Sequence, residues 1–232
     1  MSIFSKFTEG CRNYRKTTKD MSFKEKVSYT KDYYLKPVLF IAAVLIVLIS
    51  IITTSIIKIN TDVILYGVGV NTDLTTDGTE YVKDDFFKLH KTKGRQDIEY
   101  SCVTIDDFTT KTNIDSSYYS AQSVVAQVAA KRLDYLFVDE IAFQYFAAQE
   151  IYMDLNDILS GEEMVQWANH ILYTQEEGSD VMTPMGIDIS ETKFAQKFNS
   201  VKDRKIILCF AGNAPHKELV YEFFHYVVNY NG

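Results

Sequence analysis

An uncharged apolar run from Pro37 to Ile57 constrains this chain more than any other feature of its sequence. Its 21 residues include no charged and no amide side chain, and its hydroxyl groups lie toward its C-terminal end. As an α-helix the run is about 31 Å long, which matches the hydrocarbon thickness of a bilayer. A core helix of a soluble domain needs an apolar stripe on one face only, and two buried strands would not form so long an unbroken run. The run therefore predicts one membrane-spanning helix.

The charges on the two sides of this run differ in sign. Residues 1–36 carry nine Lys and Arg against four Asp and Glu, a net charge of +5, whereas residues 37–232 carry 15 against 27, a net charge of −12. Lys and Arg close to a span stay on the cytoplasmic side. We therefore expect a single-pass protein of the cell membrane with a cytoplasmic N-terminus. No small-residue cleavage site follows the run, which favours an uncleaved anchor over a signal peptide.

The sequence thus divides into three parts: a basic cytoplasmic tail with a juxtamembrane helix (1–36), a transmembrane helix (37–57) and an extracytoplasmic domain (60–232). Residues 1–20 are polar and basic, and we expect little fixed structure in them. Ser22 and Glu25 have the spacing of a capping box, so a helix should begin near Phe23. This helix either lies on anionic lipid through its lysines and aromatic side chains or simply leads into the span.

After the span, short apolar runs alternate with amphipathic stretches, a pattern typical of βαβ units. Extended runs predict strands at residues 62–70, 98–105, 133–138 and 205–210, with a further extended stretch at 181–189 and a turn at 153–159. Helical spacing predicts helices at residues 80–90, 118–132, 140–148 and 162–173, and a closing helix capped by Asn213 with Pro215 in its first turn. The predicted fold class is α/β, with a mostly parallel sheet flanked by helices.

Several kinds of chemistry are not indicated by the sequence. The acidic outer domain argues against a nucleic-acid partner, and the Cys and His residues lack zinc-ligand spacing. Gly67-Val-Gly-Val-Asn lacks the third glycine of a phosphate loop, and neither a nucleophile elbow nor an H-E-x-x-H motif occurs. We therefore expect no cofactor, no metal and no enzymatic activity. Cys102 and Cys209 lie in apolar runs and are predicted to be buried free thiols, although a disulfide is permitted outside the cell.

Four segments of the outer domain resemble, in the same order, parts of bacterial extracellular solute-binding proteins. They are Ala130–Glu140 (AKRLDYLFVDE), Ile151–Leu159 (IYMDLNDIL), Gly186–Ser190 (GIDIS) and Ile206–Phe224. The resemblance covers most of residues 62–230 and implies one lobe of a type 2 periplasmic-binding fold. Only Ser160–Asp180 is left for the second lobe, so that lobe is missing or vestigial. The tail and span also resemble those of small anchored proteins of Gram-positive bacteria.

Polar residues follow the ends of the first three predicted strands. In open α/β sheets, ligands bind outside the carboxyl ends of the parallel strands. The candidate ligand-binding residues there are Asn71, Asp73, Asp106, Asp107, Ser116, Ser117, Asp139 and Glu140. Carboxylates attract cations and accept hydrogen bonds from hydroxyls, which favours a small cationic or polyhydroxyl ligand. The alternative is that Asp115, Ser116 and Asp139 only cap helices or occupy their first turns.

Together these patterns predict a membrane-anchored, solute-binding-like module that captures or senses a ligand outside the cell. The alternative function is that of an interaction or structural protein, which keeps the fold without a ligand cleft and docks on a membrane-protein partner.

Overall fold

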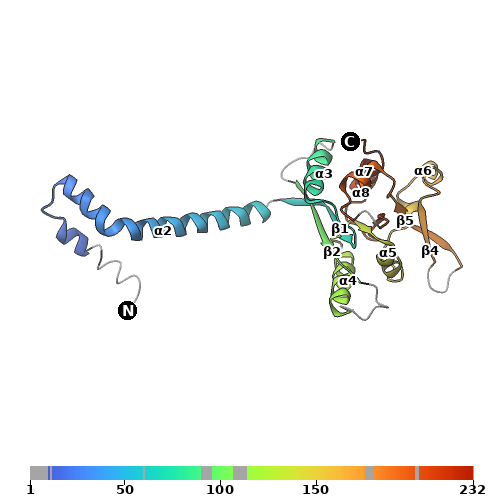
Figure 1. Cartoon of the computed structure of the whole chain (residues 1–232), viewed down its shortest axis with the longest axis horizontal. Helices are drawn as coiled ribbons and strands as arrows, with labels where there is room; N and C mark the ends of the chain where they lie inside the picture. The colour runs from blue at the N-terminus through green and yellow to red at the C-terminus, as the bar shows by residue number, and fades with distance from the viewer. Residues whose placement is uncertain are drawn as a thin grey trace. The chain divides into compact units, whose positions relative to one another are not determined.

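The computed structural model describes residue 10 and residues 12–59, 61–89, 96–106, 114–175, 180–201 and 204–231. The chain forms two compact units, Met1–Asn60 and Thr61–Gly232, and each is considered by itself (Figure 1).

The first unit is dominated by one helix, α2 (Phe23–Ile59), which confirms the predicted helix over the apolar run. The capping box is present, since the Ser22 N–H donates to Glu25 Oε2 at 2.7 Å. Within α2, the stretch Leu39–Ile56 has a mean hydropathy of 2.8, and none of it is buried in the protein. This helix is therefore long and apolar enough to cross a membrane.

The expectation of little fixed structure before Phe23 is wrong for part of the tail, because residues 12–17 are helical. The Tyr14 hydroxyl lies 2.9 Å from the Thr30 hydroxyl of α2, and the Tyr14 and Tyr29 rings are 6.2 Å apart. Tyr14 thus has partners on α2, which the polar composition of the tail did not indicate.

The second unit is built on a six-stranded sheet with the order β2-β1-β3-β6-β5-β4. β1 pairs in parallel with β2 and β3, whereas the pairs β3–β6, β6–β5 and β5–β4 are antiparallel. The strands are β1 (Asp62–Val70), β2 (Gln96–Val103), β3 (Tyr135–Val138), β4 (Ile171–Gln175), β5 (Met182–Asp188) and β6 (Ile207–Phe210). The α/β class is confirmed, but the sheet is mixed rather than mostly parallel.

The three parallel strands were predicted well, as were the positions of β5 and β6, expected at 181–189 and 205–210, but the edge strand β4 was not. The helix expected at 162–173 ends at Gln166, and Ile171 begins the edge strand β4, which forms a hairpin with β5. The edge strand β4 has only five residues, too few for a clear alternation of apolar and polar side chains in the sequence. In its partner β5, Pro184 and Gly186 interrupt the alternation. The short helix α7 was not predicted, and the closing helix α8 begins at Lys217 rather than just after Asn213.

Helices cover both faces of the sheet, with α3, α7 and α8 on one side and α4 and α5 on the other (Figure 1). Their bounds are α3 (Thr76–Leu89), α4 (Ile114–Ala129), α5 (Glu140–Ala147), α7 (Lys193–Phe198) and α8 (Lys217–Val228), with α6 (Gly161–Gln166) and the 3-10 helix η1 (Leu155–Asp157) in the connection to β4.

An aromatic layer joins α3, α7 and α8 to the sheet. The Phe223 ring of α8 lies 4.3 Å from that of Tyr135 on β3 and 5.7 Å from that of Phe86 on α3. Phe194 of α7 lies 5.8 Å from Phe137, two residues beyond Tyr135 on the same face of β3. All five of these side chains are buried, so this layer forms the centre of the hydrophobic core.

Asp134 connects the parallel and antiparallel halves of the sheet. Its fully buried carboxylate accepts hydrogen bonds from the Tyr66 N–H of β1 and the His216 N–H before α8, at 2.9 and 3.1 Å. The His216 ring contacts the same carboxylate through Nδ1 at 3.1 Å. The backbone of Asp134 pairs with Tyr66 and with Ala211, which follows β6. One side chain therefore holds the starts of β3 and α8 against β1.

The close packing of β1 against Tyr135 predicts a strong effect of the substitution Gly67→Ala. A Cβ atom at Gly67 would lie within 2.1 Å of the Tyr135 ring, and the fully buried Tyr135 has little room to move. We expect the free energy of unfolding to fall by about 2 kcal/mol. Urea unfolding followed by fluorescence of Trp167, the chain's one tryptophan, measures this change in the second unit.

Gly161→Ala is the matched control, because a Cβ there has nothing within 4 Å. Its stability should stay within about 0.5 kcal/mol of the original. Equal losses in the two variants would contradict the packing described for Gly67.

Candidate functional site

Asn71 stands at the centre of the carboxyl edge of the parallel strands. It follows β1 with a φ of 58°, a left-handed conformation that asparagine tolerates better than most residues. Its side-chain amide donates to the Ile105 carbonyl at 2.8 Å and its oxygen accepts from the Ile105 N–H at 2.8 Å. The same amide donates to Asp139 Oδ1 at 3.2 Å. Asn71 therefore links the ends of the three parallel strands and is itself buried.

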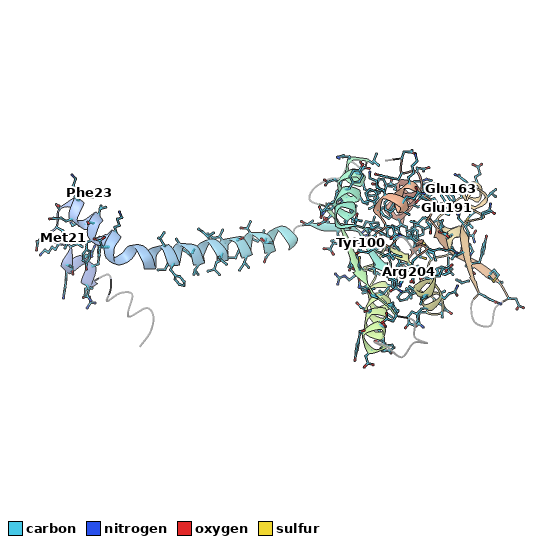
Figure 2. The ribbon with its side chains drawn as sticks, viewed as in Figure 1. Met21, Phe23, Tyr100, Glu163, Glu191 and Arg204 are labelled. Atoms are coloured by element: carbon cyan, nitrogen blue, oxygen red, sulfur yellow. The ribbon has the colours of Figure 1, made fainter. Side chains whose placement is uncertain are left out.

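Asp139 is the N-cap of α5, and both of its carboxylate oxygens have partners. Oδ1 accepts from the Ala142 N–H at 2.8 Å in addition to Asn71, and Oδ2 lies 3.1 Å from Nη1 of Arg204. Arg204, labelled in Figure 2, belongs to the segment before β6. Asp139 is only 3% exposed, so few positions remain for a ligand. These contacts favour the capping alternative for this residue.

Glu140 also has a partner from the segment before β6. Its Oε1 lies 2.6 Å from the Lys205 ammonium, and both side chains are exposed. This hydrogen bond raises the pKa of Lys205 above its ordinary value. Arg204 and Lys205 thus neutralise Asp139 and Glu140, two of the acids expected at this edge.

The remaining predicted residues form separate small groups. Asp73 is exposed, and its Oδ1 accepts from the Cys102 thiol of β2 at 2.7 Å. The Asp106 N–H donates to the buried Ser117 hydroxyl at 2.9 Å, while the neighbouring Ser116 is exposed. Asp107 lies outside the described residues. The structure thus brings Asn71 and Asp139 into contact, but it does not gather the predicted acids around one open site.

Surface hollows lie elsewhere on the second unit. One of about 580 Å³ lies between α3 and α8, and one of about 390 Å³ lies beside the first turns of α8. Across the described ranges, His, Cys, Asp and Glu side chains nowhere form a group of three or more that could hold a metal ion.

Reasoning from the sequence missed both the basic pair Arg204 and Lys205 and the hollow between α3 and α8. Arg204 and Lys205 stand at the start of the strand predicted at 205–210, and this position could have indicated the basic pair from the sequence.

Comparisons of this chain with protein-family models, with curated proteins and with solved structures find no match. The interpretation of the site therefore depends on its own geometry.

The two cysteines of the second unit are free thiols, as predicted, although only Cys209 is buried and Cys102 is exposed. Their strands are three positions apart in the sheet, roughly 14 Å by the usual strand spacing, which is too far for a disulfide. Burial of the sulfur, with the hydrogen bond to Asp73 second, raises the pKa of Cys102 to about 12. Burial raises the pKa of Cys209 well above its ordinary value.

These pKa directions predict slow thiol chemistry in the native protein. At neutral pH both groups stay protonated, and the thiolate of Cys102 forms only as the pH approaches about 12. A maleimide should therefore modify Cys102 slowly and Cys209 not at all until denaturant is added. Asp73→Asn should speed the reaction of Cys102, because it removes a carboxylate that disfavours the thiolate. Intact mass measured over time gives both rates, and rapid native labelling of Cys209 would contradict the structure.

The contacts of Asp139 and Glu140 predict very different effects of substitution. Asp139→Ala removes a helix cap and leaves Arg204 and the Asn71 amide without this acceptor, so we expect a loss of about 2 kcal/mol in the free energy of unfolding. Glu140→Gln removes one exposed ion pair and should change stability by less than about 0.5 kcal/mol. Urea unfolding measures the stability of both variants. If Asp139→Ala left the free energy of unfolding unchanged, the structural role of Asp139 would be contradicted and ligand binding would again be the better explanation of this residue.

Proposed function

We propose that this protein is a membrane-anchored extracytoplasmic module that binds a partner or ligand and does not catalyse a reaction. The observation that carries this proposal is α2, whose apolar stretch Leu39–Ile56 is unburied and uncharged. The basic residues before it and the acidic unit after it support a cytoplasmic N-terminus and an outer C-terminal domain.

A binding role is supported by the pairing of the polar groups at the carboxyl edge. Asp139 and Glu140 face Arg204 and Lys205, and Cys102 is a thiol with a raised pKa rather than a reactive thiolate. A nucleophile or general base must be free to act on a substrate, whereas Asp139 and Glu140 are held in ion pairs and Cys102 stays a protonated thiol. The resemblance to one lobe of a solute-binding protein supports the same class of function.

Two forms of binding follow from this class. A solute-binding protein holds its ligand at the carboxyl edge, between two lobes. Here that edge is occupied by the side chains of Asn71, Asp139 and Arg204, and no large segment is left for a second lobe. These contacts favour the alternative function, in which the domain docks on a membrane-protein partner, over solute capture at this edge.

The proposal is tested by the orientation of the chain in the membrane. With a different epitope tag on each terminus, protease added to wall-free intact cells should remove the C-terminal tag and spare the N-terminal tag. Permeabilised cells, in which both tags should be lost, provide the control for access.

A charge-inverted tail gives the matched variant. Changing Lys24, Lys26 and Lys31 to Glu removes positive charge before the span and should increase the fraction of molecules with the opposite orientation. A C-terminal tag that stays protected in intact cells expressing the original chain would end this proposal.

A further inference from the structure

The larger surface hollow, which we call the α3–α8 hollow, has a chemical character that the carboxyl edge lacks. It measures about 580 Å³, within the range of small-molecule sites. Its walls combine three tyrosine rings with two carboxylates, namely Tyr81 and Asp85 from α3 and Glu222, Tyr226 and Tyr230 from α8 and the residues that follow it.

The rings are held in position by edge-to-face contacts. The Tyr230 ring lies 6.2 Å from that of Tyr81 and 6.0 Å from that of Tyr226, at steep interplanar angles. Tyr226 also meets Phe86 of the core at 5.7 Å. These contacts tie the walls of the hollow to the aromatic layer beneath them, so the site is preformed rather than assembled from mobile side chains.

The hydroxyl of Tyr226 is the unusual feature of this hollow. The residue is only 8% exposed, and among the described residues its hydroxyl has no hydrogen-bond partner in bonding geometry. Burial, with the nearby Asp85 second, raises the pKa of Tyr226, so the group remains a neutral phenol. Asp85 lies close enough to this hydroxyl to contribute a hydrogen bond to the same pKa change. Buried hydroxyls are nearly always paired, so the Tyr226 hydroxyl takes its partner either from Asp85 or from a ligand that enters the hollow.

The same rings already contact an ammonium group. Lys197 of α7 places Nζ 4.6 Å from the centroid of the Tyr81 ring and 5.1 Å from that of Tyr230. It also donates a hydrogen bond to the Tyr230 hydroxyl at 2.5 Å, which raises the pKa of Lys197. Tyrosine faces attract cations through their quadrupole, so an aromatic environment suited to ammonium groups extends to the edge of the hollow.

The charges around the hollow favour a cation. Asp85 and Glu222 contribute two carboxylates, and of the side chains in the wall only His225 is basic, with its Nε2 paired to Glu163 at 2.8 Å. Lys197 is held by the Tyr230 hydroxyl, and Lys193 approaches Asn231 in the wall at 3.5 Å. An anionic ligand would meet both carboxylates at close range.

We propose that the α3–α8 hollow binds a small organic ammonium ion that also carries a hydroxyl group. The tyrosine rings and Asp85 receive the ammonium group, and the Tyr226 hydroxyl pairs with the hydroxyl of the ligand. This inference rests on the proposed function as a binding module, and it places the ligand between two helices rather than at the carboxyl edge of the sheet.

The test uses choline as the probe and the full chain in maltoside micelles, a detergent without an ammonium group. Isothermal titration calorimetry should detect choline binding that is about tenfold tighter than that of 3,3-dimethylbutan-1-ol, its uncharged analogue of equal shape. Tetramethylammonium, which lacks the hydroxyl, should bind more weakly than choline.

Three substitutions assign the contacts. Asp85→Asn should weaken choline binding about tenfold. Tyr226→Phe should remove the advantage of choline over tetramethylammonium while changing the melting temperature little, because Asp85, the protein group within reach of the deleted hydroxyl, is not in good hydrogen-bond geometry with it. Lys197→Gln should tighten binding by removing a competing positive charge. Asp115→Asn, an exposed change on α4 over the opposite face of the sheet, should leave binding unchanged.

Equal binding of choline and its neutral analogue, or no heat from either, overturns the ammonium site. An unaltered choline affinity in the Asp85→Asn variant does the same. Neither outcome bears on the orientation of the anchor, so failure of this inference and failure of the proposed function remain distinguishable.

Discussion

The fully buried carboxylate of Asp134 is the contact on which the arrangement of the second unit depends. Burying a charge is costly unless hydrogen bonds compensate for the lost water. Here the compensation comes from the Tyr66 N–H, the His216 N–H and the His216 ring. The Tyr66 N–H belongs to β1 and both His216 groups lie just before α8, so the carboxylate is satisfied only when β1, β3 and the start of α8 are all in place. Asp134 thereby joins the parallel half of the sheet to the antiparallel half.

The position of α8 follows from this contact and has functional consequences. With its start held at Asp134, α8 lies across the aromatic layer, and Phe223 packs on Tyr135 and Phe86. The next turn of α8 carries Tyr226 beside Phe86, at the wall of the α3–α8 hollow. The hollow is therefore a consequence of how two helices meet over the core. At the carboxyl edge, in contrast, Asn71, Asp139 and Arg204 fill the space between the strand ends.

Reasoning from the sequence succeeded where a local pattern decides the structure. The strand predicted at 62–70 is β1 with the same bounds, and the helix spacing at 118–132 identified α4 to within a few residues. It failed at residues 162–173, because five residues of edge strand have too little periodicity to be separated from the end of a helix. That error hid the β4–β5 hairpin. The mixed character of the sheet was missed separately, because β6 is antiparallel to β3 and to β5, and a strand's direction in a sheet leaves no local pattern.

The sequence by itself determined the apolar helix, the opposite charges on its two sides and the alternation of strands and helices, because each depends on neighbouring residues. Tertiary structure alone decided which polar groups are paired. Asp139 meets Arg204 from 65 positions away, and this distant partner neutralises one of the acids expected at the carboxyl edge. The surroundings of the Tyr226 hydroxyl have the same kind of origin, since only the packing of α8 against α3 brings Asp85 near it without good hydrogen-bond geometry. Pairing between distant residues leaves no periodic signal in a single sequence, so it becomes visible only once the chain is folded.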